Sequence, residues 1–247
     1  MANLFTTIFY QPILNLLVFL YNTVSFQDLG VAIILLTVII KLVFWPLGRQ
    51  AIKSQKSLQD LQPKIEELKK QYKDKTELSR ATMELYKNNK VNPFSSCLPL
   101  LIQLPFLFAV YRVFIDGLKN DLSLVYPFVY KPESMNLLAF GFFDLSKRSI
   151  VLAVLAGLAQ FWQAKMMITK KPAVQTTGSK DESMTAIMNK QMLYFMPAIT
   201  IFIGISLPGG LTLYWFVITA LTALQQLLTF KKTDPKVGQA IEGEVLK

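Results

Sequence analysis

Five stretches of mostly apolar residues constrain this sequence more than any other feature. They lie at residues 29–47, 92–115, 149–168, 191–207 and 211–230. An α-helix rises 1.5 Å per residue, so about 20 residues cover a hydrocarbon core of roughly 30 Å. Hydrophobic residues make up 52% of the chain, charged residues only 17%, and the mean hydropathy is +0.37. The pattern predicts an all-α polytopic membrane protein with five transmembrane helices.

A sixth apolar stretch, at residues 8–24, is interpreted as an amphipathic helix that lies in the membrane interface. Pro12 limits this helix to about a dozen residues, which is too short to span comfortably. Gln11, Asn15 and Asn22 fall on one face at 100° per residue. The alternative is a poor first span, which would raise the number of spans to six.

Basic residues are distributed unevenly between the loops, and this predicts the orientation. Residues 49–90 contain eleven Lys/Arg and six Asp/Glu, whereas residues 1–30 contain no Lys or Arg. The positive-inside rule therefore predicts an N-out/C-in topology. The resulting connecting segments are an outer N-terminal segment 1–28, a cytoplasmic segment 48–91, an extracytoplasmic loop 116–148, a cytoplasmic loop 169–190 and a cytoplasmic tail 231–247.

The cytoplasmic segment 48–91 is predicted to be a helical hairpin. Its apolar residues recur at three- and four-residue steps, as at Leu58, Leu61 and Ile65, and Pro63 lies where a second helix can begin. Its excess of five basic charges (eleven minus six) suits an acidic docking partner such as ribosomal RNA or anionic lipid. The alternative is a solvated hairpin without a partner.

Lys41 is the only charged residue in the first apolar stretch, with Thr37 one helical turn earlier. A charge at bilayer depth costs about 2.5 kcal/mol or more, so such a residue usually faces a polar cavity or a partner. The alternative is that the ammonium group snorkels to the nearby interface. Other polar residues in the spans either form interhelical hydrogen bonds or line a wet cavity with Lys41. They include Gln103, Gln160, Gln163, Thr222, Gln225 and Gln226.

The residue types present argue against an enzyme. The chain has no histidine and one cysteine, Cys97, and the five stretches contain no Asp or Glu. General acid–base catalysis, nucleophilic triads and Cys- or His-based metal sites all need such groups. We therefore expect no catalytic residue, no cofactor and no metal ion.

Four stretches together resemble a known family. They read VIIKLVFWPLGRQAIKSQKSLQDLQPKIEELKKQY (38–72), NPFSSCLPLLIQLPFLFAVYRVF (92–114), MNKQMLYFMPAIT (188–200) and LPGGLTLYWFVITALTALQQLL (207–228). In order and spacing the chain resembles the YidC family of membrane protein insertases, which has mitochondrial and thylakoid relatives. The resemblance covers nearly the whole chain. It is similar to a minimal form of the family, without the large extracytoplasmic domain of some relatives.

The resemblance implies a five-helix bundle with a hydrophilic groove that opens to the cytoplasm and to lipid. It places the groove cation at Lys41 and groove polar residues at Thr37 and Gln103. The positions it implies for contact with substrate helices are Leu107, Ile203 and Trp215. The chain departs from the family at two places. Lysine replaces the usual arginine at position 41, which keeps the charge but loses the bidentate hydrogen bonding of a guanidinium group. The family's NP-x-G-G-C pattern reads NPFSSC at 92–97.

The function implied by the resemblance is insertion and folding of other membrane proteins. The implied partners are newly made membrane proteins and the lipid bilayer, with the ribosome and a Sec-type translocon as further candidates, and the chain is expected to work as a monomer. The bacterial plasma membrane is the expected location, with an organellar inner or thylakoid membrane as the alternative. A small-solute channel or transporter with the same groove, and an assembly factor that holds helices, are the alternative functions.

Overall fold

The computed structural model describes residues 4–92, 98–118, 122–167 and 190–231. Residues 93–97, which contain Cys97 and most of the NPFSSC stretch, lie outside the described residues. So do nearly all of the predicted loop 169–190 and of the predicted tail 231–247.

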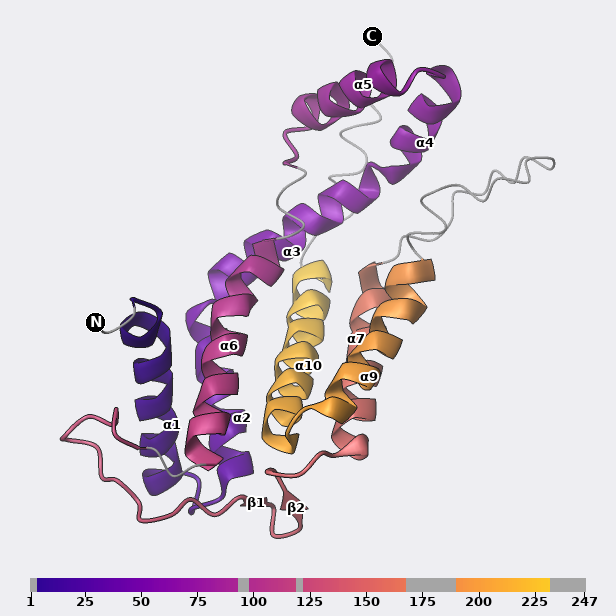
Figure 1. Ribbon diagram of the computed structural model, residues 1–247. Helices are drawn as coiled ribbons and strands as arrows, with labels where there is room; N and C mark the ends of the chain where they lie inside the picture. The colour runs from indigo at the N-terminus through magenta and orange to yellow at the C-terminus, as the bar shows by residue number, and fades with distance from the viewer. Residues whose placement is uncertain (1–3, 93–97, 119–121, 168–189, 232–247) are drawn as a thin grey trace.

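The fold is an all-α bundle in which α10 is the central helix (Figure 1). Helix α10 packs on α7, α2 and, more lightly, α6, while α9 packs on the outside of α7. The bundle helices are α1 (Gln11–Thr23), α2 (Leu29–Val43), α6 (Leu98–Leu118), α7 (Ile150–Met167), α9 (Met196–Ser206) and α10 (Gly209–Lys231). Short π-helical turns precede two of them, η1 (Thr6–Tyr10) before α1 and η3 (Gln191–Phe195) before α9. Leu14, Ile33 and Tyr214 are fully buried in the core between these helices.

Within the described residues, two helices are long and apolar enough to cross a membrane. They are α7, with 18 residues, and the first 22 residues of α10. A third candidate is the pair formed by Leu29–Val43 and Trp45–Gln71, which is bent by 70°, and Gln191–Ser206 is a shorter apolar helix. The structure thus supports a helical membrane protein, and the count of five spans stays a prediction.

The first apolar helix ends four residues earlier than the predicted boundary at residue 47. Helix α2 stops at Val43, Phe44 leaves the helical region with ψ of 11°, and α3 (Trp45–Asp60) begins immediately. Pro46 explains the break, because it has no amide to donate to the carbonyl four residues earlier, its ring crowds that carbonyl, and it suits the first turn of a new helix. The polypeptide therefore changes direction by 70° just after Lys41.

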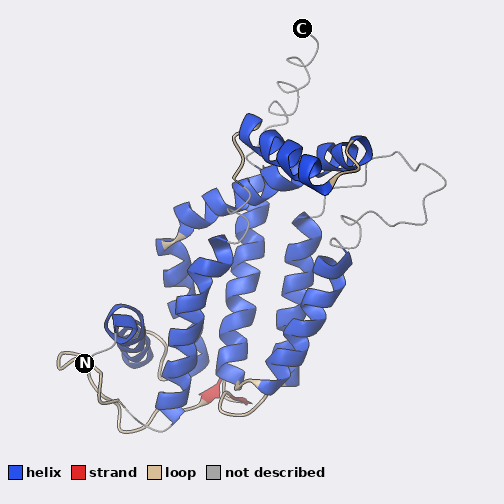
Figure 2. Cartoon of the chain, turned by 45° about the horizontal axis from the view of Figure 1, so that its top comes forward, coloured by secondary structure: helices blue, strands red, loops and turns tan. Residues whose placement is uncertain are grey.

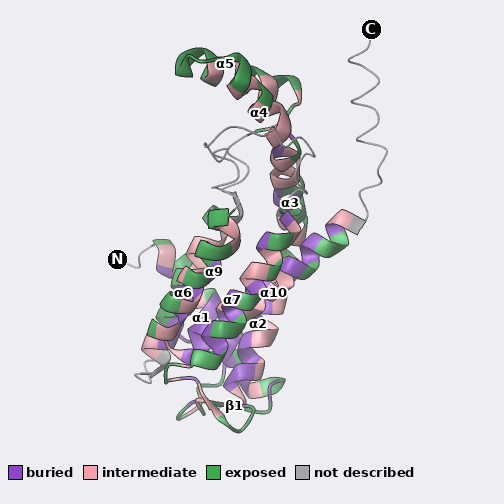
Figure 3. Ribbon diagram, turned by 90° about the vertical axis from the view of Figure 1, so that its right-hand side faces the viewer, coloured by how far each residue is buried: buried purple, intermediate pink, exposed green. Residues whose placement is uncertain are grey.

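The segment predicted as a hairpin contains α3, α4 (Gln62–Gln71) and α5 (Lys75–Asn88). The first half of α3 belongs to the bundle, since Ala51 and Ile52 are buried and α3 packs on α10 and α6. Helices α4 and α5 project beyond the bundle (Figure 1), and no residue of α5 is buried (Figure 3). Only the outer part of this segment therefore stands clear of the other helices.

Helix α1 uses its polar face differently from the sequence-based interpretation. Asn15 donates to the Leu124 carbonyl oxygen at 3.3 Å and accepts from the Tyr126 amide at 2.7 Å, and Gln11 donates to the same Leu124 oxygen at 3.2 Å. Asn22 donates to the Tyr130 carbonyl oxygen at 2.7 Å. The polar face of α1, formed by Gln11, Asn15 and Asn22, thus holds the backbone of the loop that follows α6. Figure 2 shows α1 nearly end-on while the other bundle helices are seen from the side, so α1 is tilted against them.

Replacing Asn15 with alanine should loosen this loop. The side chain is 5% exposed, so its loss leaves the Tyr126 amide without its acceptor in a largely buried place. We expect a loss of about 1–3 kcal/mol in stability and faster amide exchange at residues 122–130. The control is Asn22→Ala, whose hydrogen bond is exposed to solvent and whose loss should cost less. Equal exchange in both variants and the unaltered protein would contradict this role.

Candidate functional site: a cationic cavity between the helices

The fold points Lys41 across the bundle rather than along its own helix. Its Nζ atom donates to the Thr222 Oγ1 atom of α10 at 2.8 Å, and that hydroxyl donates its own proton to the Ile218 carbonyl oxygen at 2.7 Å. Lys41 lies twelve residues after the start of α2 and Thr222 thirteen after the start of α10. Both helices begin at the same end of the bundle, so the two side chains lie at similar depth (Figure 1). The ammonium group therefore lies between two helices, with a hydroxyl partner on α10.

A cavity of about 340 Å³ lies beside Lys41. Its walls come from the end of α2, the first half of α3, and parts of α6, α7 and α10. The polar part of the lining consists of Lys41, Tyr214, Thr219, Thr222 and the six glutamines Gln55, Gln103, Gln160, Gln163, Gln225 and Gln226. No acidic side chain belongs to this described lining, so the lysine is surrounded by amides and hydroxyls without a counter-charge.

Gln103 lines the cavity and also joins two helices. Its Nε2 atom donates to the hydroxyl of Tyr214 at 2.5 Å, which links α6 to α10. Tyr214 itself is fully buried. Gln103 therefore serves both purposes that the sequence left open for polar residues in the spans, interhelical hydrogen bonding and lining of a polar space.

The structure brings together four of the six residues singled out from the sequence. Lys41, Gln103, Leu107 and Trp215 all belong to the cavity lining. Thr37 does not belong to it: this residue is fully buried and donates to the Ile33 carbonyl oxygen of its own helix at 2.6 Å. Ile203, on α9, is also outside the lining and is 39% exposed.

Gln225 and Gln226 are the residues that sequence reasoning undervalued. Both are almost completely buried in the cavity wall, and the Oε1 atom of each has no hydrogen-bond partner among the described residues. A buried acceptor without a donor is costly, so these two oxygens indicate a place where water or a bound polar group completes the site. Two adjacent glutamines inside an apolar span were the available sequence signal.

Gln225 also fixes the joint between α2 and α3. Its Nε2 atom donates to the Trp45 carbonyl oxygen at 2.8 Å, directly after the bend. The neighbouring turn of α3 carries Gly48, where an added Cβ atom would lie 2.9 Å from Gln225 Oε1 and 3.1 Å from its Nε2. The absence of a side chain at Gly48 therefore lets α3 approach α10 closely.

A double-mutant cycle at this joint should show a change of sign. Gly48→Ala alone is expected to destabilise, because the added Cβ displaces the buried Gln225 amide from its bond to the Trp45 carbonyl, which costs about 1–3 kcal/mol against a helix-propensity gain of roughly 0.5–1 kcal/mol. In a Gln225→Ala background the clash is gone, so the same substitution should stabilise. Thermal unfolding in detergent measures both effects. An equal effect of Gly48→Ala in the two backgrounds would show that the contact does not constrain the joint.

Comparison with known proteins decides the family. The model of the family described as 60Kd inner membrane protein matches residues 19–236. The chain belongs to this family. Membership of the 60Kd inner membrane protein family, together with the apolar helices, places it in a membrane. The resemblance to YidC noted from the sequence is confirmed by individual relatives.

The membrane protein insertase YidC of Geobacter sp. (strain M21) is 34% identical over 227 residues, covering 91% of this chain and 37% of that protein. That of Syntrophus aciditrophicus is 37% identical over 219 residues, covering 87% of this chain and 35% of the relative. The chain thus spans little more than a third of these relatives. The YidC of Fusobacterium nucleatum subsp. nucleatum is 34% identical over 227 residues and is covered to 97%.

A solved structure supports the same assignment. The chain is similar to an active YidC insertase whose first transmembrane domain is resolved, with a TM-score of 0.57 and 28% sequence identity. The match covers 94% of this chain and 47% of that protein. These relatives are named as insertases, and none of the comparisons supports the alternative of a small-solute channel.

Proposed function

We propose that this chain is a membrane protein insertase, a non-enzymatic protein that moves newly made membrane proteins into the bilayer and helps them fold. The observation that carries the proposal is the cavity: a space of about 340 Å³ with one uncompensated cation, inside a bundle of apolar helices. The names of the relatives support the same function.

The cavity lowers the barrier for a hydrophilic segment that has to cross the membrane. Each polar group that enters hydrocarbon without a hydrogen bond costs several kcal/mol. The glutamines and threonines of the lining offer donors and acceptors, and the free Gln225 and Gln226 oxygens can accept from backbone amides. Lys41 attracts acidic residues in a setting of low dielectric, where Coulomb interactions are stronger than in water.

Hydrophobic transfer supplies the driving force for the rest of the substrate. Burying apolar surface in lipid gains about 25 cal/mol per Å², so a whole transmembrane helix needs no nucleotide to enter the bilayer. Leu107 and Trp215 line the cavity beside its polar groups and are the proposed contacts for such a helix. Neither Thr37 nor Ile203 lines the cavity, and the proposal that Ile203 contacts substrate therefore rests on its partly exposed position on α9.

A reconstitution experiment tests the function. Liposomes that contain the purified chain should insert a nascent membrane protein with an acidic translocated segment, measured by protection from external protease. The same liposomes should not release a small encapsulated dye. Dye release without insertion would favour a channel, and neither activity would favour an assembly factor.

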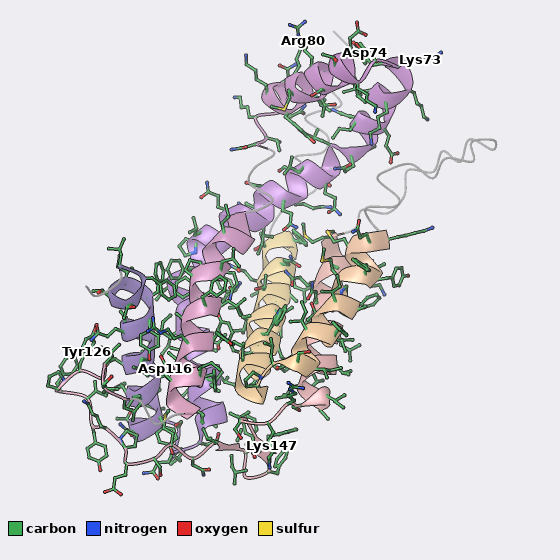
Figure 4. The ribbon with its side chains drawn as sticks, in the orientation of Figure 1. Lys73, Asp74, Arg80, Asp116, Tyr126 and Lys147 are labelled. Atoms are coloured by element: carbon green, nitrogen blue, oxygen red, sulfur yellow. The ribbon has the colours of Figure 1, made fainter. Side chains whose placement is uncertain are left out.

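We further propose five spans with an N-out/C-in orientation, in the bacterial plasma membrane. The positive-inside rule supports this, because residues 49–90 contain eleven Lys/Arg and six Asp/Glu. Lys73, in the turn between α4 and α5, and Arg80, on α5, lie at one end of the molecule, while Tyr126 and Lys147 lie at the opposite end (Figure 4). On this proposal α4 and α5 face the cytoplasm and the loop after α6 faces outward.

Cysteine labelling checks the orientation. In a Cys97→Ser background, a cysteine at position 73 should react only when the reagent reaches the cytoplasmic side. A cysteine at position 133 should react with a membrane-impermeant reagent added from outside. Both positions are exposed, so access to the side chain is not limiting. Outside labelling at position 73 would overturn the orientation and with it the direction in which the cavity opens.

A further inference from the structure

Five aromatic side chains project from the end of the bundle where α2 and α10 begin. They come from three segments of the chain, and we refer to them together as the outer aromatic surface. Its members, with their exposed fractions, are Phe26 (97%), Phe128 (83%), Tyr130 (73%), Phe142 (71%) and Phe140 (43%). The loop and the small hairpin that carry four of them lie at the lower end of the molecule in Figure 1.

Hydrogen bonds fix part of this surface at the level where α2 starts. Asp28 is the N-cap of α2, and its Oδ1 atom accepts from the Val31 amide at 3.0 Å. Its other carboxylate oxygen accepts from the Phe140 amide at 2.5 Å. Phe26 precedes Asp28 by two residues. Both aromatic residues are therefore held at the point where an apolar helix begins.

The remaining members are held at the ends of other helices. The hairpin of β1 (Leu138–Ala139) and β2 (Phe143–Asp144) is tied to the start of α10, because the Gly209 amide donates to the Lys147 carbonyl oxygen at 2.8 Å. The Gly210 amide donates to the Leu145 oxygen at 3.0 Å. Asn22, in the last turn of α1, holds the Tyr130 carbonyl. These contacts place the hairpin and Tyr130 at the boundary between apolar helices and polar loops.

The backbone conformation at Phe26 and Phe140 indicates that these aromatic residues make contacts outside the protein. Phe26 and Gln27 have φ of 53° and 61°, and Phe140 has φ of 54° before Gly141 at 77°. This left-handed conformation favours glycine or asparagine and is strained for a phenylalanine. Phe26 gains almost no packing within the protein in return, since it is 97% exposed. Strain that internal contacts do not offset is typical of functional positions.

We propose that the outer aromatic surface inserts into the boundary between lipid headgroups and acyl chains. Aromatic rings prefer this zone, and they form belts there in membrane proteins. The exposed Lys131, Glu133 and Lys147 lie in the same loop and hairpin and suit the adjoining headgroups. The loop after α6 then lies on the membrane instead of extending into the outer solution, and it sets the depth at which the cavity sits in the bilayer. The inference needs the membrane location only and does not rest on the proposed insertase function.

Spin labels on single cysteines test the insertion. In a Cys97→Ser background, labels at positions 26, 128 and 142 are compared in liposomes of pure phospholipid. The matched controls are position 73, on the projecting hairpin, and position 154, on the exposed side of α7. Each label is scored by its collisions with oxygen, which dissolves in lipid, and with a nickel complex, which stays in water.

The three labels of the surface should collide with the nickel complex several-fold less than the label at position 73, and their oxygen collisions should approach those at position 154. Collision rates like those at position 73 would overturn the proposal. Protection that arises only after other membrane proteins are added would also overturn it, in favour of a protein-binding surface.

A second variant shows whether the aromatic residues themselves set the depth. Phe26→Gly with Phe142→Ser removes two rings, and the glycine fits the left-handed backbone, so the fold should persist. The label at position 128 should then move toward water in this variant. An unchanged collision profile at position 128 would show that the aromatic residues do not anchor the loop.

Discussion

Lys41→Ala is expected to reduce the insertion of substrates with an acidic translocated segment by about ten- to a hundred-fold, since hydrogen bonds to charged groups contribute about 1.5–3 kcal/mol and each 1.4 kcal/mol is a factor of ten. Among the described residues that line the cavity, Lys41 alone is charged, and its ammonium group donates to the Thr222 hydroxyl. Insertion efficiency in proteoliposomes, measured by protease protection, gives the effect.

Keeping or removing the charge at position 41 separates its electrostatic role from a packing role. Lys41→Arg should retain insertion, because the charge stays and the guanidinium can still reach the Thr222 hydroxyl. Lys41→Met, which keeps the length of the side chain, should behave like Lys41→Ala. Substrates whose translocated segment has no acidic residue should respond much less to either change. Equal insertion of acidic substrates by the unaltered protein and Lys41→Met would show that the charge is not used.

Folding of the variants is the necessary control. Removing a partly buried ammonium group relieves a desolvation cost, and Thr222 keeps its bond to the Ile218 carbonyl. We therefore expect Lys41→Ala and Lys41→Met to unfold at the same temperature as the unaltered protein or a higher one. Lower insertion together with lower thermal stability would indicate a structural role for Lys41.

Deleting residues 58–86 is expected to impair insertion while the bundle stays folded. The contacts of α3 with α10 and α6 include Ala51 and Ile52, which lie before the deletion, and α5 has no buried residue. The deletion removes the projecting part of the hairpin with most of its basic side chains. Loss of insertion with an unchanged unfolding temperature in detergent would identify α4 and α5 as a docking element for an acidic partner.

A charge variant controls for the size of the deletion. Replacing Lys73, Lys75 and Arg80 with glutamine keeps α4 and α5 but removes three of their positive charges. If docking is electrostatic, this variant should lose part of the insertion activity and part of its dependence on salt. Amide exchange should be faster in α4 and α5 than in α7 and α10. Unfolding of the bundle on deletion would make the hairpin a structural element, and full activity would exclude the docking role.

The sequence was most informative where the physics is local. Long apolar stretches predict membrane helices, because a helix satisfies its own backbone polar groups where no water is present. A lone lysine within such a stretch is energetically costly and therefore predicts a functional position. The apolar spacing and Pro63 predicted helices in the segment that now contains α4, since both effects act within a few residues. Pro46 gave an equally local signal for the break after Val43, although the first apolar stretch was predicted to run through it.

Tertiary contacts decided what these local features do. The spacing of Thr37 and Lys41 puts them one helical turn apart, yet one hydroxyl is buried against its own helix and the ammonium group faces a cavity. The Thr222 partner of Lys41 is 181 residues away, and no local pattern reveals such a pairing. The polar face of α1 was visible in the sequence. Its hydrogen-bond partners are backbone groups of the loop after α6, and these could not be predicted because every residue carries the same backbone groups.

The amino-acid sequence by itself therefore determined the class of the molecule: an all-α membrane protein with a cation inside an apolar stretch, a basic hairpin and an identifiable family. Hydrophobic length, charge and proline act within one helix, so the linear chain records them. The structure alone decided which polar side chains share the cavity, how Gln225 and Gly48 join α3 to α10, and how the outer loop is held. Those features depend on the packing of helices far apart in the sequence, because a hydrogen bond or a close approach needs both partners in place.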